Sequence, residues 1–419
     1  MQVVETFGRY VEKWSGTSPA RARQLLKTGW EAQNLKFRFT PDKRLFPADQ
    51  HLARMMMDTM LKPLKDPEHS VLVSVFTPCE LIQELGLYPY NVESFSCYLS
   101  ASKAERAFLQ TAEDSGLSET LCSYHKTFIG AAKSGVLPKP RCIVYTTLAC
   151  DANLLTFKEL AELYGVPCFA IDIPAGRTAE NVAYVAGQMR DLAVFLEKNT
   201  GKKIDENRLR ERMKRSERTL ATYDAFQKAR ADKYVPTDLV SPLYSGMTQN
   251  ILLGTKEEEA YVKRLLSGLK NAEPSKGKRI YWMHMIPFWS DAVKKELLFR
   301  ESAQIVGCEL SQVADPTQHS DDPYEDMALR LVYHSLNGSI TRRIDAGIRH
   351  AKETKADGVV WFNHWGCKHT LGGSQIAKKR FEAAGLPTLI LDGDGCDRSH
   401  GGEGQTATRL GAFLEMLNE

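Results

Sequence analysis

The sequence lacks any pair of cysteines in Cys-x-x-Cys spacing, although it contains nine cysteines in 419 residues. That absence argues against zinc ribbons, thioredoxin-like redox motifs and ferredoxin-type cluster-binding runs. The sequence also lacks a Gly-x-x-x-x-Gly-Lys-Ser/Thr motif, so we do not expect it to hydrolyse ATP through a P-loop. Any metal site must therefore combine cysteines that lie far apart in the sequence.

Long apolar runs and a strong charge of one sign are missing as well. No run approaches the roughly 18 apolar residues of a membrane span, and the N-terminus MQVVETFGRYVEKWSG does not read as a signal peptide. The formal net charge is only +3, which favours neither nucleic acid nor a membrane surface as a partner. With 43% hydrophobic and 26% charged residues, we expect a cytoplasmic protein with reduced cysteines.

Short apolar runs alternate with helical patterns in two parts of the chain. The runs are typical of buried strands and fall at residues 69–76, 141–147, 167–173, 279–288, 358–366 and 387–393. This alternation predicts an α/β fold with two Rossmann- or flavodoxin-like parallel-sheet domains. The expected divisions are a helical N-terminal segment (1–68), a first α/β domain (69–180), a helical middle segment (181–275) and a second α/β domain (276–419).

Three cysteines occupy positions where a ligand site is expected. Cys150 and Cys367 each follow an apolar run, and Cys122 opens a helix-like segment. Parallel sheets bind ligands at the carboxyl ends of their strands, and a helix start favours a thiolate. We therefore predict that the three thiols face one cleft between the domains. Three thiolates leave one iron of a [4Fe-4S] cluster open to a substrate oxygen.

The alternative role for each cysteine is that of a small buried hydrophobic residue. We expect this packing role for Cys142 and Cys168, which lie inside apolar strands, and for Cys308 in the segment IVGCEL.

Two longer stretches resemble the 2-hydroxyacyl-CoA dehydratase and benzoyl-CoA reductase family. Residues 122–174 contain a Cys-Ser at a helix start and a Cys-Asp after a strand, and residues 362–417 contain a third cysteine. The segment PCELIQELGLYP, residues 78–89, resembles an early helix of the same family. The likeness covers about residues 70–419 and is weakest in the helical middle.

The resemblance implies a function and a set of partners. In this family, cysteines that match Cys122, Cys150 and Cys367 hold a [4Fe-4S] cluster. A homologous dehydratase subunit pairs with the chain as a heterodimer or homodimer, and an ATP-dependent [4Fe-4S] activator protein delivers one electron. The electron converts a 2-hydroxyacyl-CoA into a ketyl radical, and syn or anti elimination of water then gives an enoyl-CoA. The resemblance thus implies a lyase of the hydro-lyase type.

Three further cysteines keep other interpretations open. Cys79, Cys97 and Cys396 exceed the three-cysteine pattern. One branch of the family carries an [8Fe-9S] double-cubane cluster, for which these six cysteines suffice in number. The chain is then an ATP-dependent double-cubane reductase of small molecules or a benzoyl-CoA-reductase-like subunit. A non-catalytic electron-relay subunit is the remaining alternative.

Several other polar residues have both a catalytic and a structural interpretation. Glu80 is a candidate proton acceptor or a partner of a helix dipole, and Ser123 is a candidate donor to the cluster or a helix cap. The histidines near the cysteines are expected to bond sulfur, to act as bases or to lie outside the site; they are His125, His364 and His369. The segment 372–374 can hold a CoA phosphate or form a tight helix entry, and Asp392 and Asp394 are expected to organise a loop.

Overall fold

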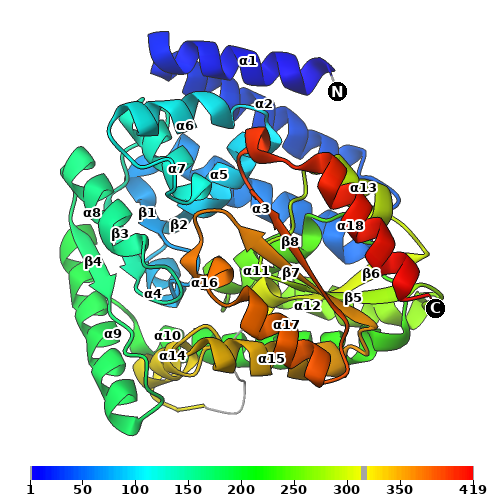
Figure 1. Ribbon diagram of the computed structural model, residues 1–419. Coiled ribbons are helices and arrows are strands. Elements are labelled where there is room, and N and C mark those ends of the chain that lie inside the picture. The colour runs from blue at the N-terminus through cyan, green and yellow to red at the C-terminus, as the bar shows by residue number, and fades with distance from the viewer. Residues whose placement is uncertain (1, 313–318, 419) are drawn as a thin grey trace.

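Two four-stranded parallel sheets form the framework of the protein (Figure 1). The computed structural model describes residues 2–312 and 319–418. The first sheet has the order β2-β1-β3-β4 and contains β1 (Ser70–Val73), β2 (Tyr88–Asn91), β3 (Cys142–Thr146) and β4 (Cys168–Ile171). The second has the order β6-β5-β7-β8 and contains β5 (Lys278–Met283), β6 (Ala303–Cys308), β7 (Gly358–His364) and β8 (Thr388–Gly393). The predicted α/β fold class is confirmed.

The six predicted apolar runs coincide with β1, β3, β4, β5, β7 and β8. The central strands β1, β3 and β7 are buried along their whole length, as strands covered on both faces by helices must be. The prediction missed β2 and β6, which are edge strands. Strand β2 has the sequence YPYN. A proline argues against a strand in a sequence, because prolines are tolerated only at the edges of sheets.

Helices surround both sheets and fill the middle of the chain. Three helices precede the first sheet: α1 (Gln2–Thr17), α2 (Pro19–Phe39) and α3 (Pro47–Lys65). The first sheet is accompanied by α4 (Glu80–Glu84), α5 (Val92–Ala101), α6 (Glu105–Asp114), α7 (Ser123–Lys133) and α8 (Asn153–Tyr164). The middle segment contains α9 (Ala179–Thr200), α10 (Glu206–Ala229), α11 (Ser241–Ile251) and α12 (Lys256–Gly268). The second sheet is accompanied by α13 (Asp291–Leu297), α14 (Pro323–Val332), α15 (Ile340–Glu353), α16 (Lys368–Leu371), α17 (Ser374–Ala383) and α18 (Glu403–Met416).

The hydrophobic cores tie the two halves together. One large core contains the first sheet and parts of α2, α3, α9 and α10. Helix α14 follows β6 in the chain, but its Met327 and Leu331 are buried in this same large core. The second sheet has a smaller core on each face, because side chains alternate along β5: Trp282 packs on one side and Tyr281 on the other. Helix α14 therefore follows a strand of the second sheet in the chain but packs with the helices of the first core.

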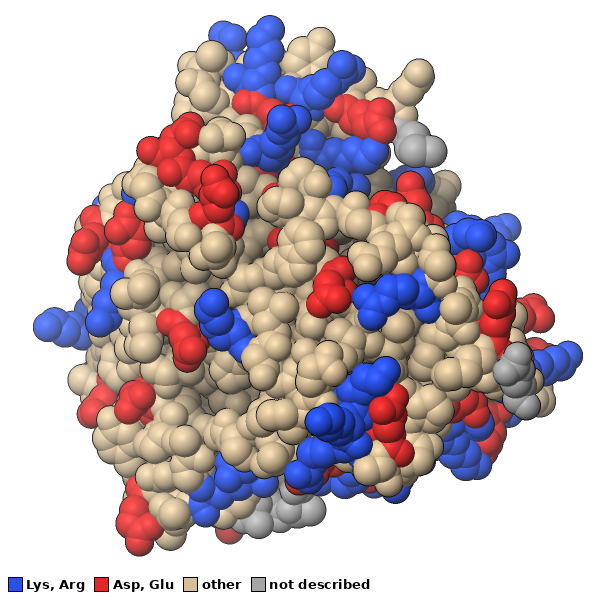
Figure 2. Space-filling model, in the orientation of Figure 1, with Lys and Arg blue, Asp and Glu red and all other residues tan. Residues whose placement is uncertain are grey.

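The surface shows no dominant sign of charge. In Figure 2, acidic and basic side chains are scattered over the face shown, and much of its centre is uncharged. Within residues 2–312 and 319–418, no helix is both long and apolar enough to cross a membrane.

Candidate functional site

A cavity of about 220 Å³ lies where the carboxyl ends of strands from both sheets meet. Its lining includes all three of the cysteines predicted to face one cleft, Cys122, Cys150 and Cys367. Each of the three is partly exposed, and each lies just before a helix. The rest of the lining is mainly apolar and comes from segments after β1, from α5, from α11 and from the loop after β5. The cavity thus has a thiol-rich end within an apolar chamber.

A close backbone contact brings the cysteines of the two halves together. Gly366 lies directly before Cys367 and has a φ of +81°, in the left-handed region that favours glycine. A Cβ atom at this position would lie 2.6 Å from the backbone nitrogen of Cys122. Only glycine therefore allows the loop after β7 to reach the start of α7.

The thiols are electrostatically coupled. Burial raises the pKa of Cys122 well above its ordinary value, and the neighbouring thiols of Cys150 and Cys367 raise it further. Burial is also the main cause that raises the pKa of Cys150 to about 12, with Glu93 and Cys367 contributing. Because three thiolates in one buried site repel one another, they require bound positive charge. All nine cysteines are free thiols, so the three are available as ligands.

The chemistry of the three thiols can be compared with what metal groups require. Among the described residues, no three His, Cys, Asp or Glu side chains are placed to share a single metal ion. In a [4Fe-4S] cluster each thiolate binds a different iron, so the ligands stand further apart. Three thiols are the donor type that such a cluster takes, so the residues present fit this group.

His364 donates a hydrogen bond to one of these sulfurs. Its Nδ1 accepts the backbone N–H of Gly395 at 3.1 Å. The ring is buried, and burial lowers the pKa of His364, so the imidazole is neutral and its proton lies on Nε2. That Nε2–H points at the Sγ of Cys122 at 3.2 Å. The predicted residue thus stabilises negative charge on sulfur.

In the contact between His125 and Cys150 the direction of the hydrogen bond is reversed, because here the histidine nitrogen is the acceptor. The Thr156 hydroxyl donates to the carbonyl of Ala152, so its oxygen accepts from Nδ1–H of His125 at 2.9 Å. The unprotonated Nε2 lies 3.3 Å from the Sγ of Cys150. Burial lowers the pKa of His125 to about 3, so the imidazole is neutral and its Nε2 accepts a hydrogen bond from the Cys150 thiol.

Ser123 connects the two halves beside the cavity. Its hydroxyl donates to Oδ1 of Asp394 at 2.6 Å, and the same oxygen accepts the backbone N–H groups of Cys396 and Asp397. Asp394 therefore organises the loop after β8, as expected from the sequence. Asp392 accepts from Asn363 at 2.8 Å and joins the ends of β7 and β8.

Glu80 lies outside the cavity, in a buried network that joins three helices. Its Oε1 accepts from the Ser216 hydroxyl at 3.0 Å and from the Arg330 guanidinium at 2.6 Å. The side chain of Glu80 is fully buried, and that of Arg330 is 13% exposed. This geometry gives Glu80 a structural partner in α14.

Replacing Arg330 with leucine is expected to lower the free energy of unfolding by about 3–5 kcal/mol, because it leaves the buried carboxylate of Glu80 uncompensated. The loss is measured by urea unfolding followed by circular dichroism. The control is Arg218→Leu, which removes an ion pair to Glu259. Because the side chain of Arg218 is 54% exposed, this change should lower the free energy of unfolding by at most about 1 kcal/mol. Equal losses in both variants would contradict a structural role for the Glu80 pair.

The additional cysteines separate into two groups. Cys97 lines the cavity, and burial raises its pKa to about 12. Cys79 donates to the carbonyl of Thr77 at 3.2 Å, and Cys396 lies 3.4 Å from the Thr127 hydroxyl. Both are fully buried beyond the cavity wall. The structure thus places four of the six candidate cysteines around one chamber.

The remaining predicted residues lie next to the site. His369 follows Cys367 on α16, and its carbonyl accepts from Arg343. A Cβ atom at Gly373 would lie 2.5 Å from Ile340, so the glycine allows close packing at the start of α17. This contact favours the tight helix entry over a phosphate site for residues 372–374.

The polar residues of the cavity that the prediction missed include Glu93 and His284. Desolvation raises the pKa of Glu93 to about 7, while its carboxylate accepts from Asn91 Nδ2 at 2.8 Å. His284 has a φ of +72°, and its buried Nε2 has no hydrogen-bond partner within the described parts of the chain. The sequence did offer a signal for His284, because this histidine stands at the end of the apolar run RIYWMH. An isolated acid after the short segment YPYN gave little signal for Glu93.

Sequence comparison gives this geometry a family context. Residues 74–417 match the family model described as 2-hydroxyglutaryl-CoA dehydratase, D-component. The (R)-phenyllactyl-CoA dehydratase alpha subunit of Clostridium sporogenes is 22% identical over 81% of this chain and 87% of its own length. A benzoyl-CoA reductase subunit of Thauera aromatica is also 22% identical, over 83% of this chain and 89% of its own length.

A third relative is the alpha subunit of the lactoyl-CoA dehydratase of Anaerotignum propionicum, which is 22% identical over 81% of this chain and 88% of its own length. Because the family model covers most of the sequence, the chain belongs to the 2-hydroxyglutaryl-CoA dehydratase D-component family.

Proposed function

We propose that this chain is the iron–sulfur subunit of a 2-hydroxyacyl-CoA dehydratase, a lyase that converts its substrate into an enoyl-CoA. The observation that carries the proposal is the convergence of Cys122, Cys150 and Cys367 on one apolar cavity. The names of several relatives, which are subunits of dehydratases acting on acyl-CoA thioesters, support the same reaction. The three thiols are the proposed ligands of a [4Fe-4S] cluster.

When bound, the cluster would supply a single electron and an iron able to polarise the thioester carbonyl. The protein contributes the surroundings of the substrate. Phe76, Leu243 and Met247 line the chamber, exclude water and accommodate an acyl chain. The buried, unpartnered Nε2 of His284 offers the substrate a hydrogen-bonding group. Its backbone N–H donates to Glu309 at 2.9 Å and helps to hold the strained conformation.

Glu93 is the proposed proton acceptor. It lines the cavity, and its pKa of about 7 is matched to proton transfer near neutral pH. A β-hydrogen is barely acidic in the intact substrate, so Glu93 removes it only after the substrate has accepted an electron and lost hydroxide. The substrate then gives up the electron that it accepted, and the net change is the loss of one water molecule.

The chain is proposed to act with other proteins. Relatives from Clostridium sporogenes include both an alpha and a beta subunit of one dehydratase, which supports a homologous partner subunit here. An ATP-dependent activator protein supplies the electron in this proposal. Large apolar side chains are exposed on α8 and near α16 and α17 and offer contact area to a partner; they include Leu154, Leu155, Trp365, Leu371 and Ile376.

The test is to purify the chain with its partner subunit without oxygen, to determine iron and sulfide, and to assay 2-hydroxyacyl-CoA substrates with a low-potential electron donor. We expect about four irons per chain and formation of enoyl-CoA detected by mass spectrometry. A content near eight irons, together with reduction rather than dehydration, would favour the double-cubane reductase. The absence of iron from protein that was purified without exposure to oxygen would contradict the proposal.

A further inference from the structure

The backbone of His284 is held on both sides by two consecutive residues at the end of β6. Its N–H donates to Oε2 of Glu309 at 2.9 Å, and its carbonyl accepts the thiol of Cys308 at 3.3 Å. A φ of +72° is strained for a residue with a side chain, and these two contacts help to offset that strain. They fix the imidazole in the wall of the cysteine cavity, where its ring centroid lies 6.2 Å from that of His364.

The carboxylate of Glu309 is held in turn by Arg343 on α15. The Nε and Nη2 atoms of Arg343 each donate to one carboxylate oxygen, both at 2.6 Å. The two side chains are only 3% and 5% exposed, so water does not compete for these bonds. Because a paired contact of this kind fixes the plane of the carboxylate as well as its position, Glu309 stays directed at the N–H of His284.

The same guanidinium also reaches the segment that carries Cys367. Its Nη1 donates at 2.5 Å to the carbonyl of His369, two residues further along the chain. Helix α16 has only four residues, so its carbonyls need donors from outside the helix. The guanidinium lies 4.8 Å above the ring of Trp361, whose indole N–H donates to the next carbonyl of α16 at 3.3 Å. All three nitrogens of Arg343 are therefore bonded, and they connect two separate segments of the cavity wall.

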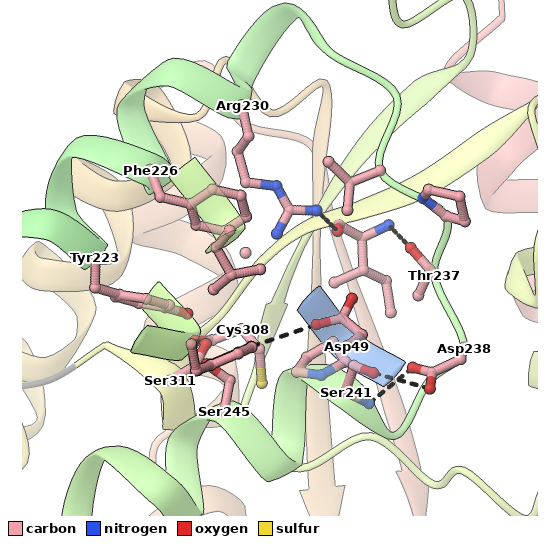
Figure 3. Close-up of a pocket in the computed structure, with 17 residues that line it drawn as sticks. Asp49, Tyr223, Phe226, Arg230, Thr237, Asp238, Ser241, Ser245, Cys308 and Ser311 are labelled. Atoms are coloured by element: carbon pink, nitrogen blue, oxygen red, sulfur yellow. Dashed lines mark hydrogen bonds between the residues drawn. The ribbon is translucent and has the colours of Figure 1, made fainter. Parts of the chain in front are cut away.

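The turn that carries Glu309 is fixed independently of Arg343. Figure 3 shows Cys308 and Ser311 in the wall of a separate small pocket of about 40 Å³. The hydroxyl of Ser311 donates to the carbonyl of Cys308 at 2.9 Å, and the N–H of Gln312 donates to the carbonyl of Glu309 at 2.9 Å. The backbone of Glu309 thus has one position, and its side chain is set by the contact with Arg343.

We propose that Arg343 is a positioning residue of the dehydration reaction, which through Glu309 fixes the imidazole of His284 relative to the segment that carries Cys367. This inference rests on the proposed function, in which the imidazole offers the substrate a hydrogen bond. The opposite charges of Arg343 and Glu309 balance, so the pair acts through geometry, and a displaced imidazole loses its alignment with the substrate. Packing alone does not require the pair, because apolar residues of similar volume often give equal stability at buried positions.

The test is a mutant cycle in the anaerobically purified protein with its partner subunit and a low-potential electron donor. The double variant Arg343→Met with Glu309→Leu removes both charges and should therefore fold, whereas either change alone leaves a buried charge unpaired. We expect it to lower kcat/KM, expressed per iron, about tenfold or more. In a His284→Ala background the same double change should lower kcat/KM by less than about twofold, because the group through which it acts is gone. Equal factors in the two backgrounds would overturn the proposal.

A second buried ion pair provides the matched control. Arg330→Met with Glu80→Leu removes a pair that lies outside the cavity, so its effect should be the same factor with and without the imidazole of His284.

Arg343→Lys keeps the charge balance but cannot form the paired bonds, and it provides a further variant if the double one fails to fold. It should lower kcat/KM about threefold or more, and only while His284 is present. An equal loss in the His284→Ala background would count against the proposal.

A crystal structure of the double variant tests the positioning without reference to activity. We expect the backbone of His284 to leave the left-handed region and its Nε2 to shift within the cavity. If this shift is seen and the wild-type protein performs no dehydration, the positioning role stands and the proposed function fails. An unchanged His284 in the double variant would overturn the inference, and observed dehydration by the wild-type protein would leave the proposed function standing.

Discussion

Cys150→Ser is expected to abolish dehydration and to remove most of the iron from the protein. The thiol of Cys150 lies 3.3 Å from Nε2 of His125 and lines the cavity together with the other two cysteines, and two remaining ligands hold a cubane poorly. Iron and sulfide per chain, with the electron paramagnetic resonance signal of the reduced protein, measure the effect. We expect iron to fall from about four per chain to below about one.

The control is Cys168→Ser on β4, an equally conservative change at a partly buried thiol of the first sheet. Cys168 lies outside the cavity lining, so this variant should keep its iron and its activity. Loss of iron in both variants would point to general instability of the fold. Retention of a full cluster in Cys150→Ser would remove this cysteine from the ligand set and contradict the proposed site.

The sequence predicted those features of the site that depend on local pattern. Apolar runs marked six strands, and each run in a parallel sheet ends at the edge where ligands bind. Cys150 and Cys367 were assigned to that edge because each follows such a run. Strand β2 was missed because its short sequence YPYN contains a proline, whereas β6, AQIVGC, was missed although it is buried along its whole length.

Long-range contacts were beyond that reasoning. Nothing near Gly366 indicates that its missing side chain makes room for Cys122, because the two residues are far apart in the sequence and meet only in the folded chain. Likewise, the residues of α14 look like part of the second half, yet they complete the core of the first. The position of Glu80 at a helix start suggested a proton acceptor, and only its contact with Arg330 reveals the buried ion pair.

Glu93→Gln is expected to lower kcat by about 10² to 10⁴-fold while leaving the iron content unchanged. The amide keeps the size of the side chain and its place in the cavity but accepts no proton. In the wild-type protein, desolvation raises the pKa of Glu93 to about 7. The deprotonated form is the base, so kcat should rise as the pH increases through about 7 and level off above it. That inflection should disappear in Glu93→Gln.

The matched control is Glu105→Gln on α6. Burial also raises the pKa of Glu105 to about 7, but this residue pairs with Arg398 away from the cavity. If kcat falls in Glu93→Gln but not in Glu105→Gln, the loss reflects proton transfer at the active site and not a general effect of removing a buried acid. If both variants retained kcat and the inflection near neutral pH, the proton acceptor would have to be another group, and the unpartnered imidazole of His284 would be the next residue of the cavity to replace.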